Sequence, residues 1–176
     1  MNREQESNLN DCLQLRQPIL SDTNAIEAIL QQVQGLHIKL RPDVYRPVSP
    51  MMTEERLATL IEEKTALVVV WRKEAGEETI VAYADWMFRE YQSPTHVPRR
   101  VLYLDTLAVE EQYRNRGIGA AILDWVKEYA REKGMDGIEL QVNGRNLDAR
   151  RMYARNGFRE KSVNMELKLE HISEEK

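Results

Sequence analysis

Cysteine is almost absent: the 176-residue chain contains one, Cys12. A single cysteine excludes an intrachain disulfide and any metal site built from several thiolates. Histidine is scarce as well, and His37, His96 and His171 show no spacing typical of metal ligands. We therefore predict that the protein holds no metal ion.

Long apolar runs are also missing. No stretch approaches the roughly 20 residues that a membrane-spanning helix needs, and the first residues, MNREQESNLND, lack the apolar core of a secretion signal. We expect a cytoplasmic protein with no membrane partner. A net charge of −4 creates no field that attracts nucleic acid, so we expect no nucleic-acid partner either. The content of 42% hydrophobic and 31% charged residues is typical of a globular domain.

The spacing of apolar residues predicts alternating strands and helices. Residues 1–12 are polar, and we interpret them as a flexible leader. After them, a period of two indicates strands and a period of 3.6 indicates helices. Strands are predicted at 13–19, 65–71, 79–88, 101–109, 137–142, 158–160 and 162–170. Helices are predicted after Ser21 or Asp22, after Thr53, between Ile118 and Gly134, and at 145–157.

The connections between these elements indicate a mixed sheet. A charged turn containing Gly76 makes a hairpin, and a loop with Pro94 and Pro98 leads into the strand at 101–109. The order β-α-α-β-β-β-α-β-α-β-β predicts an α/β fold, with a mixed central sheet of about seven strands flanked by about four helices. We expect a single domain over residues 13–170, followed by a polar tail at 171–176.

The segment YRNRGIGAAI, residues 113–122, lies between a predicted strand and a predicted helix. A helix N-terminus presents unpaired N–H groups and the positive end of the helix dipole, so it favours anions. Gly117 and Gly119 let a backbone approach a ligand closely, and Arg114 and Arg116 add donors suited to phosphate oxygens. A diphosphate would use all of these features. A tight turn with solvated arginines is the alternative interpretation.

Two common phosphate motifs do not fit this segment. The dinucleotide fingerprint G-x-G-x-x-G/A fails because the sixth position counted from Gly117 is Ile122. The P-loop fails because no Gly-Lys-Ser/Thr follows the glycines. The ligand of the segment is therefore not identified by either motif.

The segment does resemble the phosphate-binding signature of the GNAT N-acetyltransferase superfamily, Gln/Arg-x-x-Gly-x-Gly/Ala. It follows LDTLAV, residues 104–109, which is similar to the strand before that signature in the family, and the predicted element order is also that of the family. Asn115 replaces a frequent Gly of the family, but Asn tolerates a left-handed backbone better than most residues. The first signature is met by Arg114, Gly117 and Gly119, and a second, Asn-x-x-Ala followed by Tyr and Gly-Phe, by Asn146, Ala149, Tyr153, Gly157 and Phe158.

The resemblance implies acetyl-CoA as a co-substrate. It implies that the strands at 101–109 and 137–142 separate at one end, where the pantetheine arm pairs with exposed backbone as an added strand would. The diphosphate would then bind the N–H groups that open the next helix. The residues expected to bind the coenzyme are Leu107, Ala108, Val109, Arg114, Asn115, Arg116, Gly117, Ile118, Gly119, Ala120 and Asn146.

The resemblance also implies two catalytic residues. Asp105 stands where many relatives carry a Glu that removes a proton from the amine, and a structural Asp at a strand bulge is the alternative reading. Asp85 and Glu90 are reserve candidates for the base. Tyr153 matches the tyrosine that protonates the leaving thiolate, with a core aromatic as the alternative.

We therefore interpret the chain as an N-acetyltransferase in which a primary amine attacks acetyl-CoA directly. No residue near the motifs supplies a nucleophile for a covalent intermediate. The main alternative is a catalytically silent acyl-CoA-binding sensor or partner module, and a plain nucleotide-binding regulator is disfavoured by the second signature. The acceptor stays open between small-molecule and peptide amines, and a homodimer is possible.

Overall fold

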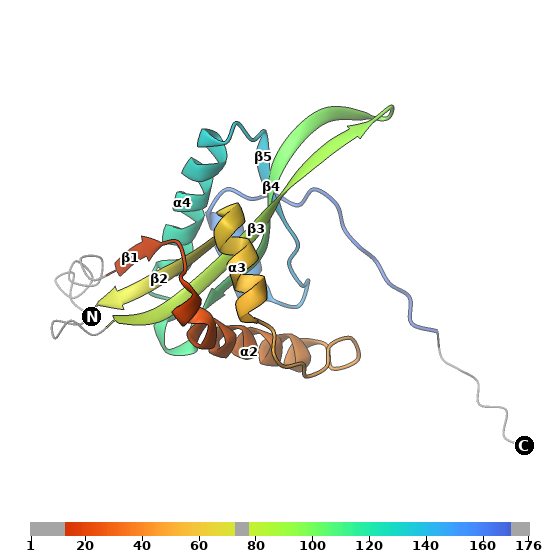
Figure 1. Ribbon diagram of the computed structural model, residues 1–176. Coiled ribbons are helices and arrows are strands. Elements are labelled where there is room, and N and C mark those ends of the chain that lie inside the picture. The colour runs from red at the N-terminus through yellow and green to blue at the C-terminus, as the bar shows by residue number, and fades with distance from the viewer. Residues whose placement is uncertain (1–12, 73–77, 170–176) are drawn as a thin grey trace, which may run out of the picture.

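A computed structural model describes residues 13–72 and 78–169 (Figure 1). The predicted leader at 1–12, most of the charged turn with Gly76 and the predicted tail at 171–176 lie outside these residues. The described chain forms a five-stranded sheet in the order β1-β2-β3-β4-β5. Its neighbouring strands pair antiparallel except β4 and β5, which pair parallel, so the prediction of a mixed α/β sheet is confirmed.

Helices and strands follow the predicted order as far as the helix at 147–155. The strands are β1 (Leu13–Arg16), β2 (Ala66–Arg72), β3 (Glu78–Ser93), β4 (His96–Val109) and β5 (Gly137–Leu140). The helices are α2 (Thr23–Leu40), α3 (Glu54–Glu63), α4 (Ile118–Glu132) and α5 (Leu147–Arg155), with 3-10 turns η1 (Leu20–Asp22) and η2 (Glu111–Tyr113). None of these helices is long and apolar enough to cross a membrane.

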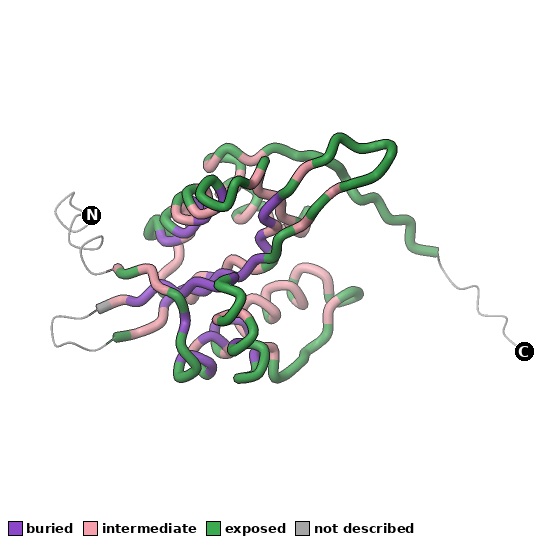
Figure 2. The backbone as a smooth tube through the Cα atoms, turned by 45° about the horizontal axis from the view of Figure 1, so that its top comes forward, coloured by how far each residue is buried: buried purple, intermediate pink, exposed green. Residues whose placement is uncertain are grey.

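The sheet is buried between two layers of helices, and Figure 2 shows the buried stretches concentrated in its middle strands. Alternate residues of β2 enter two different cores, as the period of a strand requires. Val68 and Val70 pack with Leu57 of α3 and with α2, whereas Leu67 and Val69 pack with α4. The apolar stripe of α4 that faces the sheet consists of Ile118, Ile122, Leu123, Val126 and Ala130.

Several helix ends follow from local side-chain chemistry. The Thr53 hydroxyl accepts a hydrogen bond from the Arg56 N–H at 3.2 Å and caps α3, as predicted. Gly134 has φ = +66° just after α4, which is the left-handed position where glycine ends helices. These short-range signals hold α3 and α4 at the lengths that cover the two faces of the sheet.

The hairpin of β3 and β4 corrects one prediction. A loop was expected between residues 88 and 101, but β3 continues to Ser93 and β4 begins at His96. The pairing is irregular between Tyr91 and Ser93, opposite the region of Pro98. A proline donates no backbone hydrogen bond, and this irregularity lets the ladder pass it. The result is a long arm that projects beyond the sheet (Figure 1).

The two terminal strands are a second correction, because the sheet has five strands where about seven were predicted. Residues 158–169 have no regular secondary structure. Their apolar residues do alternate, but a strand exists only when another strand accepts its backbone hydrogen bonds. No edge of the described sheet pairs with this segment.

Candidate active site

β4 and β5, the last two strands of the sheet, separate after Leu104. β5 pairs with β4 only from Val101 to Leu104, whereas β3 pairs with β4 as far as Val109. Beyond Leu104, one side of the β4 backbone therefore has no strand partner in the described chain. The predicted residues Leu107, Ala108 and Val109 all lie on this open stretch.

Asp105 occupies a β-bulge where this open stretch begins. Asp85 of β3 pairs with Thr106, but the next residue, Trp86, pairs with Leu104, so Asp105 is the extra residue. Leu104 and Leu107 both pack in the core beneath α4, so the bulge fits two residues between them instead of one. The Asp105 side chain is exposed. The bulge agrees with the structural reading of Asp105 and leaves its carboxylate open to a ligand.

A left-handed loop joins β4 to α4. Asn115 has φ = +62° and Gly117 has φ = +82°, so the Asn in place of the family's frequent Gly does adopt the left-handed backbone. The first backbone hydrogen bond of α4 runs from the Ala121 N–H to the Gly117 carbonyl at 3.0 Å. The N–H groups of Ile118, Gly119 and Ala120 precede that bond and have no partner within the helix.

The two arginines of the loop have different roles. Arg114 Nε donates to the carbonyl of Val109 at 3.0 Å, which fastens the loop to the last residue of β4. The Arg116 side chain is exposed, with its guanidinium carbon 5.4 Å from the centre of the Tyr113 ring. Arg116 is thus exposed to solvent beside the Tyr113 ring, whereas Arg114 is held at the junction between β4 and the loop.

Gly119 lies in close contact with the side chain of Met152. A Cβ atom at this position would lie 2.8 Å from Met152 Sδ and 3.7 Å from Leu107 Cδ2. The first distance is shorter than side chains tolerate, although the flexible methionine could shift. The first turn of α4 thus lies against both α5 and the open stretch of β4. Sequence reasoning assigned this glycine to the approach of a ligand and missed the contact with Met152.

The helix α5, whose Met152 lies beside Gly119, carries Asn146 as its N-cap and Tyr153 directly after Met152. Asn146 Oδ1 accepts a hydrogen bond from the Ala149 N–H at 3.1 Å, so its predicted role as the cap of α5 is confirmed. Tyr153 packs edge-on against Phe158, with 5.6 Å between ring centres. Burial raises the pKa of the Tyr153 hydroxyl to about 12. Among the described residues this hydroxyl has no hydrogen-bond partner.

A buried acidic network lies behind Asp105. Asp85 Oδ2 accepts a hydrogen bond from the Tyr83 hydroxyl at 2.8 Å and lies 3.3 Å from Arg56 Nη2 of α3. Burial raises the pKa of Asp85, and the charge of Asp105 adds to the rise while Arg56 opposes it. Sequence reasoning named Asp85 only as a reserve and missed Arg56 and Tyr83, because neither belongs to a motif.

Glu90, the other reserve candidate, lies elsewhere. It pairs with Arg100 at 3.2 Å on the projecting hairpin, five residues along β3 from Asp85. Its carboxylate is exposed there and lies away from the bulge. Glu90 thus lies farther along β3 from the bulge than Asp85, the other reserve candidate.

The segment after α2 has its own contacts. Arg41 pairs with Asp43 at 2.9 Å and with Glu166 at 2.5 Å. The Tyr45 ring lies 5.0 Å from the ring of His37. Arg41 thus pairs with two carboxylates, and Tyr45 packs beside His37.

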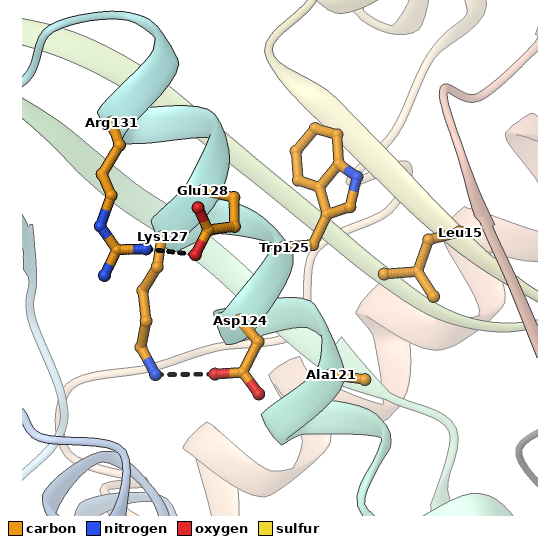
Figure 3. A pocket seen from close by; sticks show the side chains of 7 residues that line it. All are labelled: Leu15, Ala121, Asp124, Trp125, Lys127, Glu128 and Arg131. Carbon is orange, nitrogen blue, oxygen red and sulfur yellow. Dashed lines mark hydrogen bonds and ion pairs between the residues drawn. The ribbon is translucent and has the colours of Figure 1, made fainter.

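A hollow on the outer side of α4 is unrelated to these residues. Figure 3 shows it lined by Leu15 of β1 and by α4 side chains that carry two ion pairs, Asp124 with Lys127 and Glu128 with Arg131. No predicted site residue lines it. The described residues also contain no group of three His, Cys, Asp or Glu side chains that could hold a metal ion.

Comparison with known proteins decides the family. The model of the Acetyltransferase (GNAT) family matches residues 33–158, which include the open stretch of β4, the loop and α5. The chain belongs to the GNAT acetyltransferase family. The predicted family, enzyme class and GNAT-like fold are confirmed, and membership implies an acyl-CoA co-substrate.

Individual GNAT relatives are distant. The uncharacterized N-acetyltransferase YhfO of Bacillus subtilis is 26% identical over 148 residues, 84% of this chain and 91% of that protein. The uncharacterized N-acetyltransferase MJ1207 of Methanocaldococcus jannaschii is 38% identical over 65 residues, 37% of this chain and only 29% of that protein. The crystal structure of a tetramutant of BH1408 from Bacillus halodurans superposes with a TM-score of 0.79 at 29% identity, covering 89% of this chain and 99% of that one.

The raised pKa of Asp85 predicts a specific pH dependence of stability. A carboxyl that holds its proton more tightly when folded stabilises the fold below its unfolded pKa, about 4, and loses that contribution as pH rises through its folded pKa. The free energy of unfolding of the parent should therefore fall relative to that of Asp85→Asn between pH 4 and pH 8. The expected change is about 1.4 kcal/mol for each unit of pKa shift.

Urea unfolding of both chains across this pH range measures the effect, because other carboxylates contribute equally to the two curves. Asp124→Asn, an exposed carboxylate on α4, is the matched control and should follow the parent. Parallel curves for the parent and Asp85→Asn would show that burial does not raise this pKa.

Proposed function

We propose that the protein transfers an acetyl group from acetyl-CoA to a primary amine by direct attack within a ternary complex. One observation carries the proposal: the open stretch of β4 leads, through a loop of a few residues, to the unpaired N–H groups of α4. A strand edge suits the amides of pantetheine, and a helix N-terminus suits a diphosphate. The two parts of one coenzyme would thus meet two adjoining surfaces of suitable chemistry.

The coenzyme would bind along these surfaces in chain order. The pantetheine amides would pair with the backbone of Leu107, Ala108 and Val109. The diphosphate would accept hydrogen bonds from the N–H groups of the loop and first turn, with Arg116 adding charge. Asn146 uses its Oδ1 for the helix cap, which leaves its Nδ2 to donate to a pantetheine amide carbonyl. The coenzyme-binding residues are Leu107, Ala108, Val109, Arg114, Asn115, Arg116, Gly117, Ile118, Gly119, Ala120 and Asn146.

The reaction would join the amine nitrogen to the acetyl carbon and break the bond between that carbon and sulfur. The carbonyl oxygen becomes negative on the way, and the N–H of Leu107 would stabilise it. The departing thiolate takes the proton of the Tyr153 hydroxyl. With a pKa of about 12 the hydroxyl is protonated at neutral pH, so a proton is present when the thiolate leaves, and the hydroxyl has no competing partner in the described chain.

The amine must lose a proton before it attacks. An alkyl amine with a pKa near 10.4 is almost fully protonated at pH 7, and freeing its lone pair costs about 4 to 5 kcal/mol. Asp105 would take this proton through a water molecule, because its carboxylate is exposed at the bulge beside the open stretch. The buried Asp85 is the competing candidate, since it lies nearby but is enclosed by Tyr83 and Arg56.

The transferase reading makes a direct prediction. Purified protein incubated with acetyl-CoA and a pooled panel of small amines and peptides should give at least one acetylated product by mass spectrometry. Detection of the product avoids thiol-reactive dyes, which Cys12 would also consume. Bound acetyl-CoA with no product across a broad panel would favour a silent acyl-CoA sensor.

Tyr153→Phe should separate chemistry from binding. Loss of a general acid typically lowers turnover 10²- to 10⁴-fold, whereas the ring still packs on Phe158 and the dissociation constant of acetyl-CoA should change less than about threefold. Steady-state kinetics and calorimetric titration measure the two effects. The control is Tyr129→Phe, which removes a hydroxyl at the far end of α4 that donates a hydrogen bond to the Lys64 carbonyl. An unchanged kcat in Tyr153→Phe would remove the acid from the mechanism.

Asp105→Asn and Asp85→Asn together identify the base. At pH 7, Asp105→Asn should lower kcat/KM at least tenfold, and the loss should shrink near pH 10, where the amine deprotonates in solution. Asp85→Asn should not show this high-pH recovery. If the recovery appears in Asp85→Asn and not in Asp105→Asn, the base is the buried carboxylate.

A further inference from the structure

The face of the sheet that α3 covers continues onto the projecting hairpin (Figure 1). Asp85, Met87 and Arg89 alternate along β3 and therefore share this face. Asp85 is buried and pairs with Arg56 of α3. Met87 is 42% exposed and Arg89 is half-buried. Tyr103 of β4 pairs with Met87 and lies on the same face. A surface open to solvent thus begins where α3 ends and leads along the arm.

The bulge gives this surface a negative end. Asp105 adjoins Thr106, which pairs with Asp85 across the sheet. The charge of Asp105 contributes to the raised pKa of Asp85, so its carboxylate lies near this face. Asp105 is exposed and forms no ion pair with any residue in the described ranges 13–72 and 78–169. A protonated amine would be attracted to this end, where the proposed mechanism needs it.

Arg89 makes the next part of the surface positive. Its guanidinium carbon lies 3.2 Å from the centre of the Tyr103 ring, and Nη2 lies 3.7 Å from Met87 Sδ. Met87 and its partner Tyr103 are nearer to the bulge than Arg89 is, so the side chain is directed toward the bulge and not toward the tip of the arm. Within the described chain Arg89 has no carboxylate partner. A guanidinium over an aromatic ring keeps N–H groups at its edge, and these match a carboxylate.

The charges around Glu139 do not cancel this positive region. Glu139 of β5 binds both Arg99 and Lys161. Two cations on one carboxylate leave the neighbourhood positive, so their field adds to that of Arg89. Asp105 and Arg89 are therefore an anion and a cation on one surface, each without a counter-ion among the described residues.

The separation of these two charges limits what can bind both. Tyr103 precedes Asp105 by two residues, about 7 Å along a strand, and the Arg89 guanidinium lies over Tyr103. A ligand that reaches both charges needs an amine and a carboxylate about that far apart. In a simple α-amino acid the two groups are attached to the same carbon and lie too close together. The side-chain amine of lysine or ornithine lies at a suitable distance from the carboxylate.

We propose that the acceptor is a small amino acid that carries its reactive amine on its side chain, with its carboxylate bound by Arg89 and its amine beside Asp105. Arg89 is then a specificity-determining residue, because it directs the distant amine toward the acetyl group. Its side chain points back toward the bulge, and this short span suits a compact ligand better than a peptide laid along the arm. The inference rests on the proposed acetyl transfer, whose bond changes it keeps.

Lysine and lysinamide form a matched pair of acceptors, because lysinamide keeps both amines and replaces the carboxylate by an amide. The parent should favour lysine in kcat/KM at least about tenfold, the scale of a charged hydrogen bond. Fragmentation of the product in the mass spectrometer should place the acetyl group on the side-chain amine. Arg89→Gln should raise KM for lysine at least about tenfold with kcat within about twofold, and should leave KM for lysinamide within about twofold.

Arg100→Gln is the matched control for Arg89→Gln. Arg100 lies on the same arm but on the opposite face, where it pairs with Glu90 at 3.2 Å, so this variant should keep the preference for lysine. Arg89→Glu should invert the preference, because it repels the carboxylate. The ratio of the two kcat/KM values does not depend on the fraction of folded enzyme, so a partly unfolded variant still gives a valid result.

Calorimetric titration of lysine into protein saturated with coenzyme A separates this inference from the proposed transfer. Lysine binding that Arg89→Gln weakens at least about tenfold, with no acetylated product, would refute the transfer and retain the carboxylate site. Equal acetylation of lysine and lysinamide would retain the transferase and overturn the role of Arg89. An Arg89-dependent preference for a peptide with an acidic second residue over lysine would overturn the small acceptor, as would lysine that neither binds nor reacts.

Discussion

The parting of β4 from β5 after Leu104 is the constraint on which the rest of the site depends. A strand inside a sheet normally forms backbone hydrogen bonds with a neighbour on each side, and β4 has two such neighbours only over Val101–Leu104. The bulge at Asp105 falls at the point of separation. It turns the strand without breaking its pairing to β3. A backbone edge thus stays available in the middle of a well-packed domain.

The region around this edge combines polar groups of different environments. Tyr153 is enclosed enough to keep its proton, Asp105 is exposed, and Asp85 is buried between Tyr83 and Arg56. These contrasts come from the layers of the fold, because one face of the sheet carries α3 and the other carries α4 and α5. The proposed acid and base would thus work in separate surroundings on one sheet.

Local chemistry made much of the fold predictable from the sequence. The cap at Thr53, the left-handed Gly134 and the stripe of α4 are set by neighbours in the chain, and the loop with two glycines is similar to a known signature. The register of β3 on β4 is not local: the bulge at Asp105 and the ladder past Pro98 depend on which residues face each other across strands. The prediction of two terminal strands was wrong for a related reason. Val163, Met165 and Leu167 do alternate with polar residues as in a strand, but no strand of the described sheet pairs with them. The contact of Gly119 with Met152 joins two helices that no pattern connects.

The bond from Arg114 to the Val109 carbonyl has a consequence of its own. It ties the loop to the end of β4, so the helix that follows starts at a set distance from the open strand edge. The two surfaces proposed for the coenzyme would then lie at a separation set by the backbone, and this separation would select for the length of the coenzyme. A thioester on a shorter carrier arm would bind either the open edge of β4 or the N-terminus of α4, but it could not span both. The site would therefore select the acyl donor by the length of its carrier arm as well as by its acyl group.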